Sequence, residues 1–185
     1  MPENRAEVEK WLAAQDDAHD WRAFTMATLR LEGNPDPTEA QANAREQQAR
    51  DCITRVLPCD VTDADPLGSA MRGFYPLVMA HYCAEAVSTS KEKWRVYMRN
   101  IISLVKPGGV LIISAIGGAN FYRMGDLNFP CTKLNGQDVL ASLCDNGFTD
   151  IDLRIRFPPI ANKASVTSFS PARSKRAESA LAQAD

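Results

Sequence analysis

Polar side chains follow two short apolar segments of this 185-residue chain, at the points where we expect each segment to end as a β-strand. Asp60 comes after the segment 53–57, and His81 with Tyr82 follows the segment 77–80. In open α/β sheets, ligands bind at the carboxyl ends of the strands. Because a carboxylate is a strong hydrogen-bond acceptor, Asp60 is a candidate ligand-binding residue.

The cysteines and histidines show no metal-ligand or disulfide pattern. His19 and His81 lie far apart without ligand spacing, so a histidine-based metal site is not expected. The cysteines are odd in number and no two form a Cys-x-x-Cys pair: Cys52, Cys59, Cys83, Cys131 and Cys144. This pattern favours reduced thiols over a disulfide or zinc framework.

The strongest fold signal is a helix, a turn and a strand in close succession. Apolar residues recur at helical spacing over 91–105, and Pro107 cannot continue that helix. We expect Gly108 and Gly109 to supply positive φ angles for a sharp reversal. Residues 110–113 are a continuous β-branched and aliphatic run, which is typical of a strand covered on both faces in a parallel sheet. The unit predicts an α/β crossover.

Composition bounds the class of protein. The chain is 45% hydrophobic and 24% charged, which indicates an ordinary globular domain. Its formal net charge of −2, with both signs mixed, gives no basic field for nucleic acid or an anionic membrane surface. The polar start and the lack of an apolar run of about 20 residues predict neither a signal peptide nor a membrane span. We therefore expect a cytoplasmic protein.

Before the crossover, the sequence predicts three helical segments. A capping box of Asn4 and Glu7 precedes a short amphipathic helix that ends near Gln15. Apolar residues recur over 21–29, and an Ala- and Gln-rich helix is expected over 40–50.

After the crossover, residues 115–126 are expected to form a loop with a short helical turn around Tyr122. Asn135 can then cap a helix that stops at Asn146-Gly147. Strict alternation predicts a strand over 149–157, and 166–169 is expected to form a last antiparallel strand. The order of elements indicates an open α/β sheet.

Several blocks of sequence occur in an order that is typical of one enzyme family. Residues 47–62 contain Cys-Ile-Thr-Arg-Val-Leu-Pro-Cys-Asp-Val-Thr, residues 82–88 read Tyr-Cys-Ala-Glu-Ala-Val-Ser, and residues 106–109 are Lys-Pro-Gly-Gly. With the opening Asn-Arg-Ala-Glu-Val-Glu-Lys-Trp-Leu of residues 4–12, they resemble the S-adenosylmethionine-dependent methyltransferases of the nicotinamide, phenylethanolamine and thioether (NNMT/PNMT/TEMT) group. The resemblance covers residues 3–170.

This resemblance implies a Rossmann-like class I methyltransferase sheet, with helices on both faces and strand order 3-2-1-4-5-7-6. Such enzymes carry a glycine-rich loop after the first strand, but no Gly-x-Gly pattern precedes Gly33 here. We therefore hypothesise that the chain corresponds to the C-terminal two-thirds of a methyltransferase, lacking the first two strands and that loop. Residues 1–170 would form a partial methyltransferase domain, and residues 171–185 a polar, mobile tail.

By resemblance, four residues bind S-adenosylmethionine as the cofactor. The Asp60 carboxylate would accept from the adenine amino group, and Val61 would offer its backbone amide to the ring. His81 and Tyr82 would close over the adenine and place the sulfonium. Two alternatives stay open. Asp60 could cap a turn with Thr62 without binding a ligand, and His81 could be a hydrogen-bonded residue in the wall of the site.

Two further residues match catalytic positions of the family. Methyl transfer from a sulfonium needs an in-line nucleophile with a free lone pair, and a carboxylate can orient an amine or take its proton. Glu85 matches an acidic residue near the methyl acceptor, and Tyr122 matches a tyrosine that packs over substrate or sulfonium. Alternatively, Glu85 is an acid favoured at a helix N-terminus, and Tyr122 only packs.

The expected substrate wall departs from the family pattern. Ala115 stands where nicotinamide-type members carry an aspartate, and Ala119 stands where they carry a serine. Cys131 lies near a substrate-contacting serine, and Asn162 is a further candidate. Loss of these polar groups favours a less polar small-molecule amine or thioether as the acceptor.

Two functions remain open from sequence alone. The first is a methyltransferase acting on the nitrogen or sulfur of a small molecule, with a second chain supplying the missing N-terminal strands. The second is a catalytically inactive remnant that binds a protein partner through an unpaired sheet edge. We expect no nucleic acid, membrane or metal ion as a partner of either.

Overall fold

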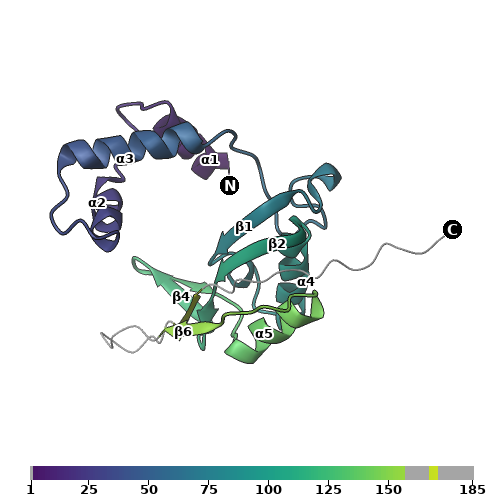
Figure 1. Cartoon of the computed structure of the whole chain (residues 1–185). Coiled ribbons are helices and arrows are strands. Elements are labelled where there is room, and N and C mark those ends of the chain that lie inside the picture. The colour runs from purple at the N-terminus through teal and green to yellow at the C-terminus, as the bar shows by residue number, and fades with distance from the viewer. Residues whose placement is uncertain (1, 157–166, 171–185) are drawn as a thin grey trace. The chain divides into compact units, whose positions relative to one another are not determined.

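A computed structural model describes residues 2–156 and 167–170 of the chain (Figure 1). The chain divides into two compact units, Met1–Pro58 and Cys59–Asp185, which are described separately. Asn162, the predicted tail 171–185, the last residue of the predicted strand 149–157 and the first of the strand 166–169 lie outside the described residues.

The first unit is helical, with α1 (Pro2–Leu12), α2 (Arg22–Leu31) and α3 (Glu39–Cys52). The prediction of three helical segments is confirmed, but α1 begins at Pro2, which suits the first helical position, so Asn4 lies inside the helix and does not cap it. The capping box belongs to α3: the Thr38 hydroxyl accepts from the Gln41 N–H and the Gln41 side chain accepts from the Thr38 N–H.

The predicted strand 53–57 is wrong, because these residues have no regular secondary structure. In the strand order that the resemblance implies, this segment would be strand 3, whose only neighbour is strand 2. A strand forms only when a neighbour takes up its backbone hydrogen bonds, and the described residues offer none here. Asp60 consequently does not follow a strand.

The second unit contains the predicted crossover. Strands β1 (Tyr75–His81) and β2 (Val105–Ser114) are joined by α4 (Lys91–Ile102), and they pair in parallel, side by side in Figure 1. Ser90 caps α4 by accepting from the Lys93 N–H at 3.3 Å. The predicted strand 77–80, helix and parallel strand are therefore confirmed.

The Lys-Pro-Gly-Gly segment belongs to β2, where the register between the strands shifts, and does not precede it. Of the two glycines only Gly108 has a positive φ, at 72°. A Cβ atom on Gly109 would lie 2.8 Å from the Lys106 carbonyl oxygen and 3.0 Å from the Pro76 carbonyl oxygen. Gly109 is thus required for close backbone approach, whereas its predicted positive φ is wrong.

The core of the second unit lies on one face of the β1–β2 pair. Leu111 and Ile113 of β2 are buried in one cluster with residues of α4 and of α5 (Gly136–Asp145). The other face carries Leu77 and Met79, whose side chains are 48% and 58% exposed. The Rossmann-like α/β prediction is confirmed, and the described helices of the second unit, α4 and α5, contribute to the core on this one face.

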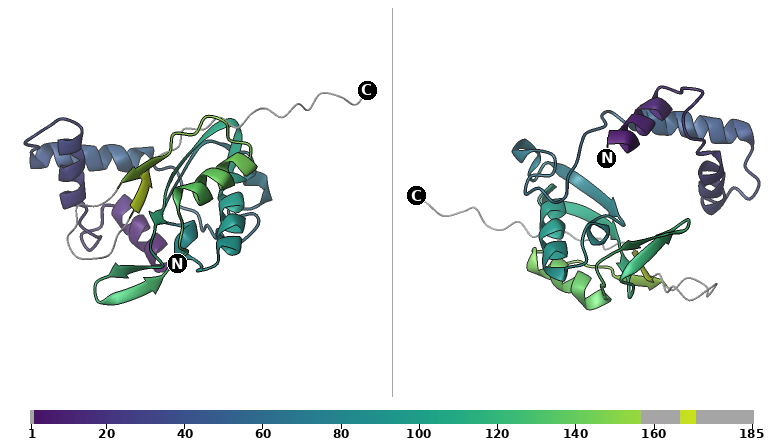
Figure 2. Two further views of the ribbon diagram at one scale, coloured as in Figure 1. Left: turned by 90° about the horizontal axis from the view of Figure 1, so that it is seen from below. Right: turned by 180° about the vertical axis from the view of Figure 1, so that it is seen from behind.

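The segment after β2 differs most from expectation. It forms β3 (Ile116–Gly117) and a hairpin of β4 (Phe121–Met124) and β5 (Leu127–Pro130), which projects from the body of the second unit (Figure 2). The predicted helical turn around Tyr122 is therefore wrong. Gly125, with φ of 60°, and Asp126 form the two-residue connection, a pairing that favours tight hairpins.

The described C-terminal part adds a cap and two strands. Asn135 and Asp138 form the predicted cap of α5. The strand predicted over 149–157 is shortened to β6 (Arg154–Arg156), because Ile151 and Leu153 pack on the core without a strand partner. Strand β7 (Thr167–Ser170) pairs antiparallel with β6 and β3, so the antiparallel prediction is confirmed. Short 3₁₀ turns occur at Ser69–Met71 and Ala84–Ala86.

Within the described ranges, none of the helices combines the length and the apolar character that crossing a bilayer requires.

Candidate cofactor and acceptor site

The carboxyl ends of β1 and β2 meet at one polar cluster. His81 and Ser114 are register partners, and His81 Nδ1 lies 3.0 Å from Ser114 Oγ. The Tyr82 N–H donates to the Ser114 carbonyl oxygen at 2.8 Å. Tyr82 has a φ of 51°, a left-handed conformation that is uncommon for a non-glycine residue and often marks functional sites. Its side chain is 48% exposed at this end of the sheet.

The Asp60 loop is fixed by local bonds and by α4. Asp60 Oδ1 accepts from the Thr62 N–H at 2.9 Å and from the Thr62 hydroxyl at 2.7 Å. The hydroxyl bond first, and the N–H bond second, lower the pKa of Asp60 below its ordinary value. Asn100 of α4 donates from Nδ2 to the Val61 carbonyl oxygen at 2.9 Å. Asp60 therefore does cap a turn with Thr62, as the alternative interpretation predicted. The bond from Asn100 holds this loop to the core of the unit.

Glu85 is buried, with only 1% of its side chain exposed. Its Oε1 accepts from the Ile116 N–H at 2.9 Å, and its carbonyl oxygen accepts from the Thr132 N–H at 2.9 Å. Burial raises the pKa of the Glu85 carboxyl, while the bond from Ile116 opposes that shift. Through these bonds Glu85 connects its own 3₁₀ turn, which follows β1, with two other segments: β3 and the residues that follow β5.

A small cavity lies beside Glu85, lined also by Cys83, Trp94, Ser114 and Ala115. Its volume is about 10 Å³, at the lower limit for a single water molecule. Burial also raises the pKa of the Cys83 thiol, and the Glu85 charge adds to that shift. The cavity as it stands has no room for a methyl acceptor in contact with the carboxylate.

The candidate substrate residues fall into two places. Ala115 is 5% exposed and lines the cavity beside Glu85. Ala119 and Cys131 lie together, because the Cys131 thiol lies 3.6 Å from the Ala119 carbonyl oxygen. Tyr122 lies on β4 and stacks on Phe129 of β5, with ring centroids 5.3 Å apart and an angle of 18° between the planes.

Three residues that hold this site together were not singled out from the sequence. Ser114 is the first polar residue after the apolar run of β2, a position that could have identified it. Asn100 lies in α4 and is 8% exposed, and a buried amide at a helical position is a signal for a specific partner. Thr132 is fully buried and donates from its hydroxyl to the Ser88 carbonyl oxygen, and its sequence gives no comparable signal.

The parallel β1–β2 pair, the α4 crossover and the polar groups at the strand ends form part of an open α/β fold. A solved SAM-dependent methyltransferase from Methanosarcina mazei has this fold: its TM-score is 0.50 at 12% identity, over 64% of this chain and 66% of that one. The sequence pattern described as the NNMT/PNMT/TEMT family matches residues 1–168, and the chain belongs to that family. The family and fold predicted from the sequence blocks are confirmed.

Named relatives agree with this assignment. Human nicotinamide N-methyltransferase is 31% identical over 147 residues, which are 80% of this chain and 54% of the relative. Rabbit (Oryctolagus cuniculus) indolethylamine N-methyltransferase is 30% identical, over 88% of this chain and 59% of its own length. Phenylethanolamine N-methyltransferase of Macaca mulatta is 27% identical, over 84% and 55%. The chain thus spans about half the length of the curated relatives it matches.

Proposed function

We propose that this chain forms the adenine-binding and acceptor-binding part of an S-adenosylmethionine-dependent methyltransferase that acts on the nitrogen or sulfur of a small molecule. The observation that carries the proposal is the polar cluster of His81, Tyr82 and Ser114 at the carboxyl ends of two parallel strands, in a chain of the NNMT/PNMT/TEMT family. The relatives' names favour nitrogen over sulfur as the acceptor atom.

Asp60 and Val61 would hold the adenine end of the cofactor. Both bonds from Thr62 go to Oδ1 of Asp60, so Oδ2 can accept from the adenine amino group. The lowered pKa keeps Asp60 ionised at neutral pH, which suits a role as an acceptor only. The Asn100 side chain donates to the Val61 carbonyl oxygen and thereby orients the neighbouring peptide groups. These features fit the binding of an adenine ring. The turn cap is compatible with this role, because the turn holds the Asp60 carboxylate in place.

His81 and Tyr82 would bound the cofactor beside the strand ends, and S-adenosylmethionine would supply the electrophilic methyl group. The bond from the Tyr82 N–H to Ser114 holds the left-handed φ of Tyr82, so the backbone from which its ring extends is fixed at this end of the sheet. Tyr122, stacked on Phe129, would form a rigid aromatic wall over the acceptor. Methyl transfer would then gain mainly from holding the acceptor lone pair in line.

Glu85 would shape the acceptor site more than contact the acceptor. Its burial and its bond to the Ile116 N–H favour a positioning role, in which the carboxylate fixes β3 next to Ala115. With Ala115, Ala119 and Cys131 in place of polar groups, the proposed acceptor is a less polar amine or a thioether. The chemistry of the relatives makes an inactive remnant the less favoured function.

The rest of the cofactor site would come from strands 1 and 2, supplied by a second chain or by sequence beyond this chain. The outer edge of β1 would accept strand 1, because among the described strands β1 pairs with β2 alone. We place the protein in the cytoplasm, since all five cysteines are free thiols.

The test is calorimetric titration of S-adenosylhomocysteine into the chain and three variants. Asp60→Asn keeps an acceptor for Thr62 but removes the charge, Asp60→Ala removes both, and Asp63→Ala is a matched loss of charge in the same loop. We expect binding to weaken about tenfold in Asp60→Asn and to vanish in Asp60→Ala, because charged hydrogen bonds are the stronger ones. Asp63→Ala should bind like the parent. A folded parent chain that gives no heat would contradict an adenine site formed by these residues.

A further inference from the structure

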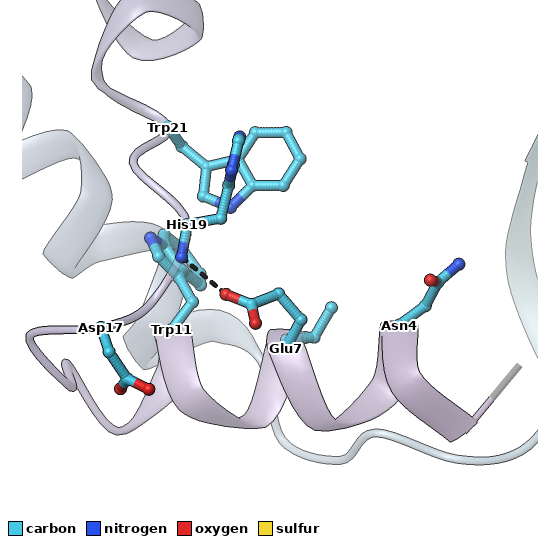
Figure 3. Close-up of a pocket in the computed structure, with 7 residues that line it drawn as sticks. Asn4, Glu7, Trp11, Asp17, His19 and Trp21 are labelled. Carbon is cyan, nitrogen blue, oxygen red and sulfur yellow. Dashed lines mark hydrogen bonds between the residues drawn. The ribbon is translucent and has the colours of Figure 1, made fainter. Parts of the chain in front are cut away.

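A second pocket is lined by residues of α1 and of the chain that follows it, and its described lining belongs to the first unit (Figure 3). Its cavity volume is about 860 Å³, within the range of small-molecule sites. Trp11, Trp21 and His19 line it together with the carboxylates of Glu7 and Asp17. Most of its surface is aromatic or apolar, and its described lining includes neither lysine nor arginine.

The tryptophans give the pocket electron-rich aromatic walls. The Arg50 guanidinium already lies over the Trp11 ring, 4.5 Å from its centroid, so this wall binds a cation within the folded chain. Trp21 has no such partner among the described residues: its ring meets His19 edge-on at 4.6 Å, and it is 41% exposed. Trp21 can therefore receive a cation from solution.

The carboxylates give the pocket a negative charge. Glu7 Oε1 accepts from the His19 backbone N–H at 2.6 Å, which holds the carboxylate between α1 and the aromatic rings, as Figure 3 shows. Asp17 is paired with the exposed Lys10 ammonium at 2.6 Å, and Lys10 also feels the charge of Glu7. Within the described residues Glu7 has no ion-pair partner of its own, so its charge is available to a ligand.

From this combination we propose that the first unit binds an organic ammonium ion with an aromatic or aliphatic body, between Trp21 and Glu7. The carboxylate attracts the cation and the indole face desolvates it, which is the arrangement that recognises quaternary and methylated ammonium groups. A neutral aromatic ligand would gain only the apolar contact. The site is independent of the proposed methyl transfer, because none of its residues belongs to the cofactor or acceptor site.

The experiment uses the whole chain, ¹⁵N-labelled, titrated with benzyltrimethylammonium while the indole N–H signals are recorded. The three tryptophans are assigned with single Trp→Phe variants, and Trp94, buried in the second unit, is an internal control. We expect the signals of Trp11 and Trp21 to move and that of Trp94 to stay. Benzyl alcohol, which carries the ring without the charge, should bind at least about tenfold more weakly.

Two matched variants test the charge. Glu7→Gln keeps an acceptor for the His19 N–H and should weaken binding of the ammonium by about three- to tenfold, whereas Glu3→Gln, on the same helix but outside the pocket, should not change it. Three results would overturn the proposal: no movement of the Trp11 and Trp21 signals in a folded chain, benzyl alcohol that binds as tightly, or equal affinities of the two variants. Equal binding of benzyl alcohol would mean an apolar groove that fits a peptide or a neutral ring.

Discussion

Glu85 offers the sharpest test of how the second unit is built, because its charge and its hydrogen bond can be removed separately. Glu85→Gln removes the charge but keeps a carbonyl oxygen for the Ile116 N–H. Glu85→Ala removes both. Burial raises the pKa of the Glu85 carboxyl above its ordinary value of 4.5, so folding favours the protonated form.

The sign of the pH dependence follows from that shift. Between the ordinary pKa and the raised one, the folded protein binds more protons at Glu85 than the unfolded chain does. The contribution of Glu85 to stability is therefore complete below pH 4.5 and falls as the pH rises toward the raised pKa. Glutamine does not titrate, so the stability of Glu85→Gln relative to the parent should increase from pH 4.5 to pH 7.5.

Glu85→Ala should instead be destabilised at every pH. It leaves the buried Ile116 N–H without an acceptor, which costs about 1–3 kcal/mol, and it opens a cavity next to Trp94 that adds about 1 kcal/mol or more. The free energy of unfolding should thus fall by about 2–4 kcal/mol.

The assay is urea unfolding followed by Trp94 fluorescence, with Trp11 and Trp21 replaced by Phe so that one tryptophan reports on the second unit. Trp94 is 1% exposed and lines the same small cavity as Glu85, so it senses this region directly. If Glu85→Gln loses as much stability as Glu85→Ala at pH 7.5, or if its difference from the parent does not change with pH, the reasoning is refuted.

Two further predictions concern the backbone around the site. Asn100→Ala removes the donor to the Val61 carbonyl and should lower stability by about 1–2 kcal/mol in urea unfolding, with a several-fold weaker S-adenosylhomocysteine titration; an unchanged titration would mean that the loop does not depend on this bond. Gly109→Ala would place a Cβ atom 2.8 Å from a carbonyl oxygen and should cost about 2–3 kcal/mol in thermal unfolding, whereas Gly108→Ala meets no atom and should cost only the positive-φ penalty of about 1–2 kcal/mol. The reverse order of the two glycine variants would disprove the close-approach argument.

The crossover was predictable because local signals and packing agree there. The helical spacing before Pro107 and the aliphatic run 110–113 each specify one element, and a helix between two strands implies a parallel pair. Tyr122 was misplaced for a local reason: the Gly125-Asp126 hairpin signal lies between short segments that do not alternate clearly. The glycine- and asparagine-containing composition of the preceding residues predicted a loop, and this prediction was given more weight than the hairpin turn.

The candidate site was recovered from the sequence only in part. Asp60 and the pair His81-Tyr82 were identified because they follow apolar segments, and the latter pair does stand at a strand end. The residues that fix them act across long stretches of the chain: Asn100 donates to the Val61 carbonyl oxygen 39 residues away, and the Ser114 hydroxyl meets the His81 imidazole 33 residues away. Sequence spacing carries no record of such contacts, so only the folded structure could reveal them.

The proposed function gives the two remaining discrepancies one physical explanation. Segment 53–57 is extended in sequence pattern yet forms no strand, and Leu77 with Met79 presents an apolar strand face that is about half exposed. Under the proposed function the same addition would resolve both, because in the strand order that the resemblance implies strand 1 pairs with β1 and strand 2 pairs with segment 53–57. Among the described residues β1 finds its partner in β2, whereas segment 53–57 finds none.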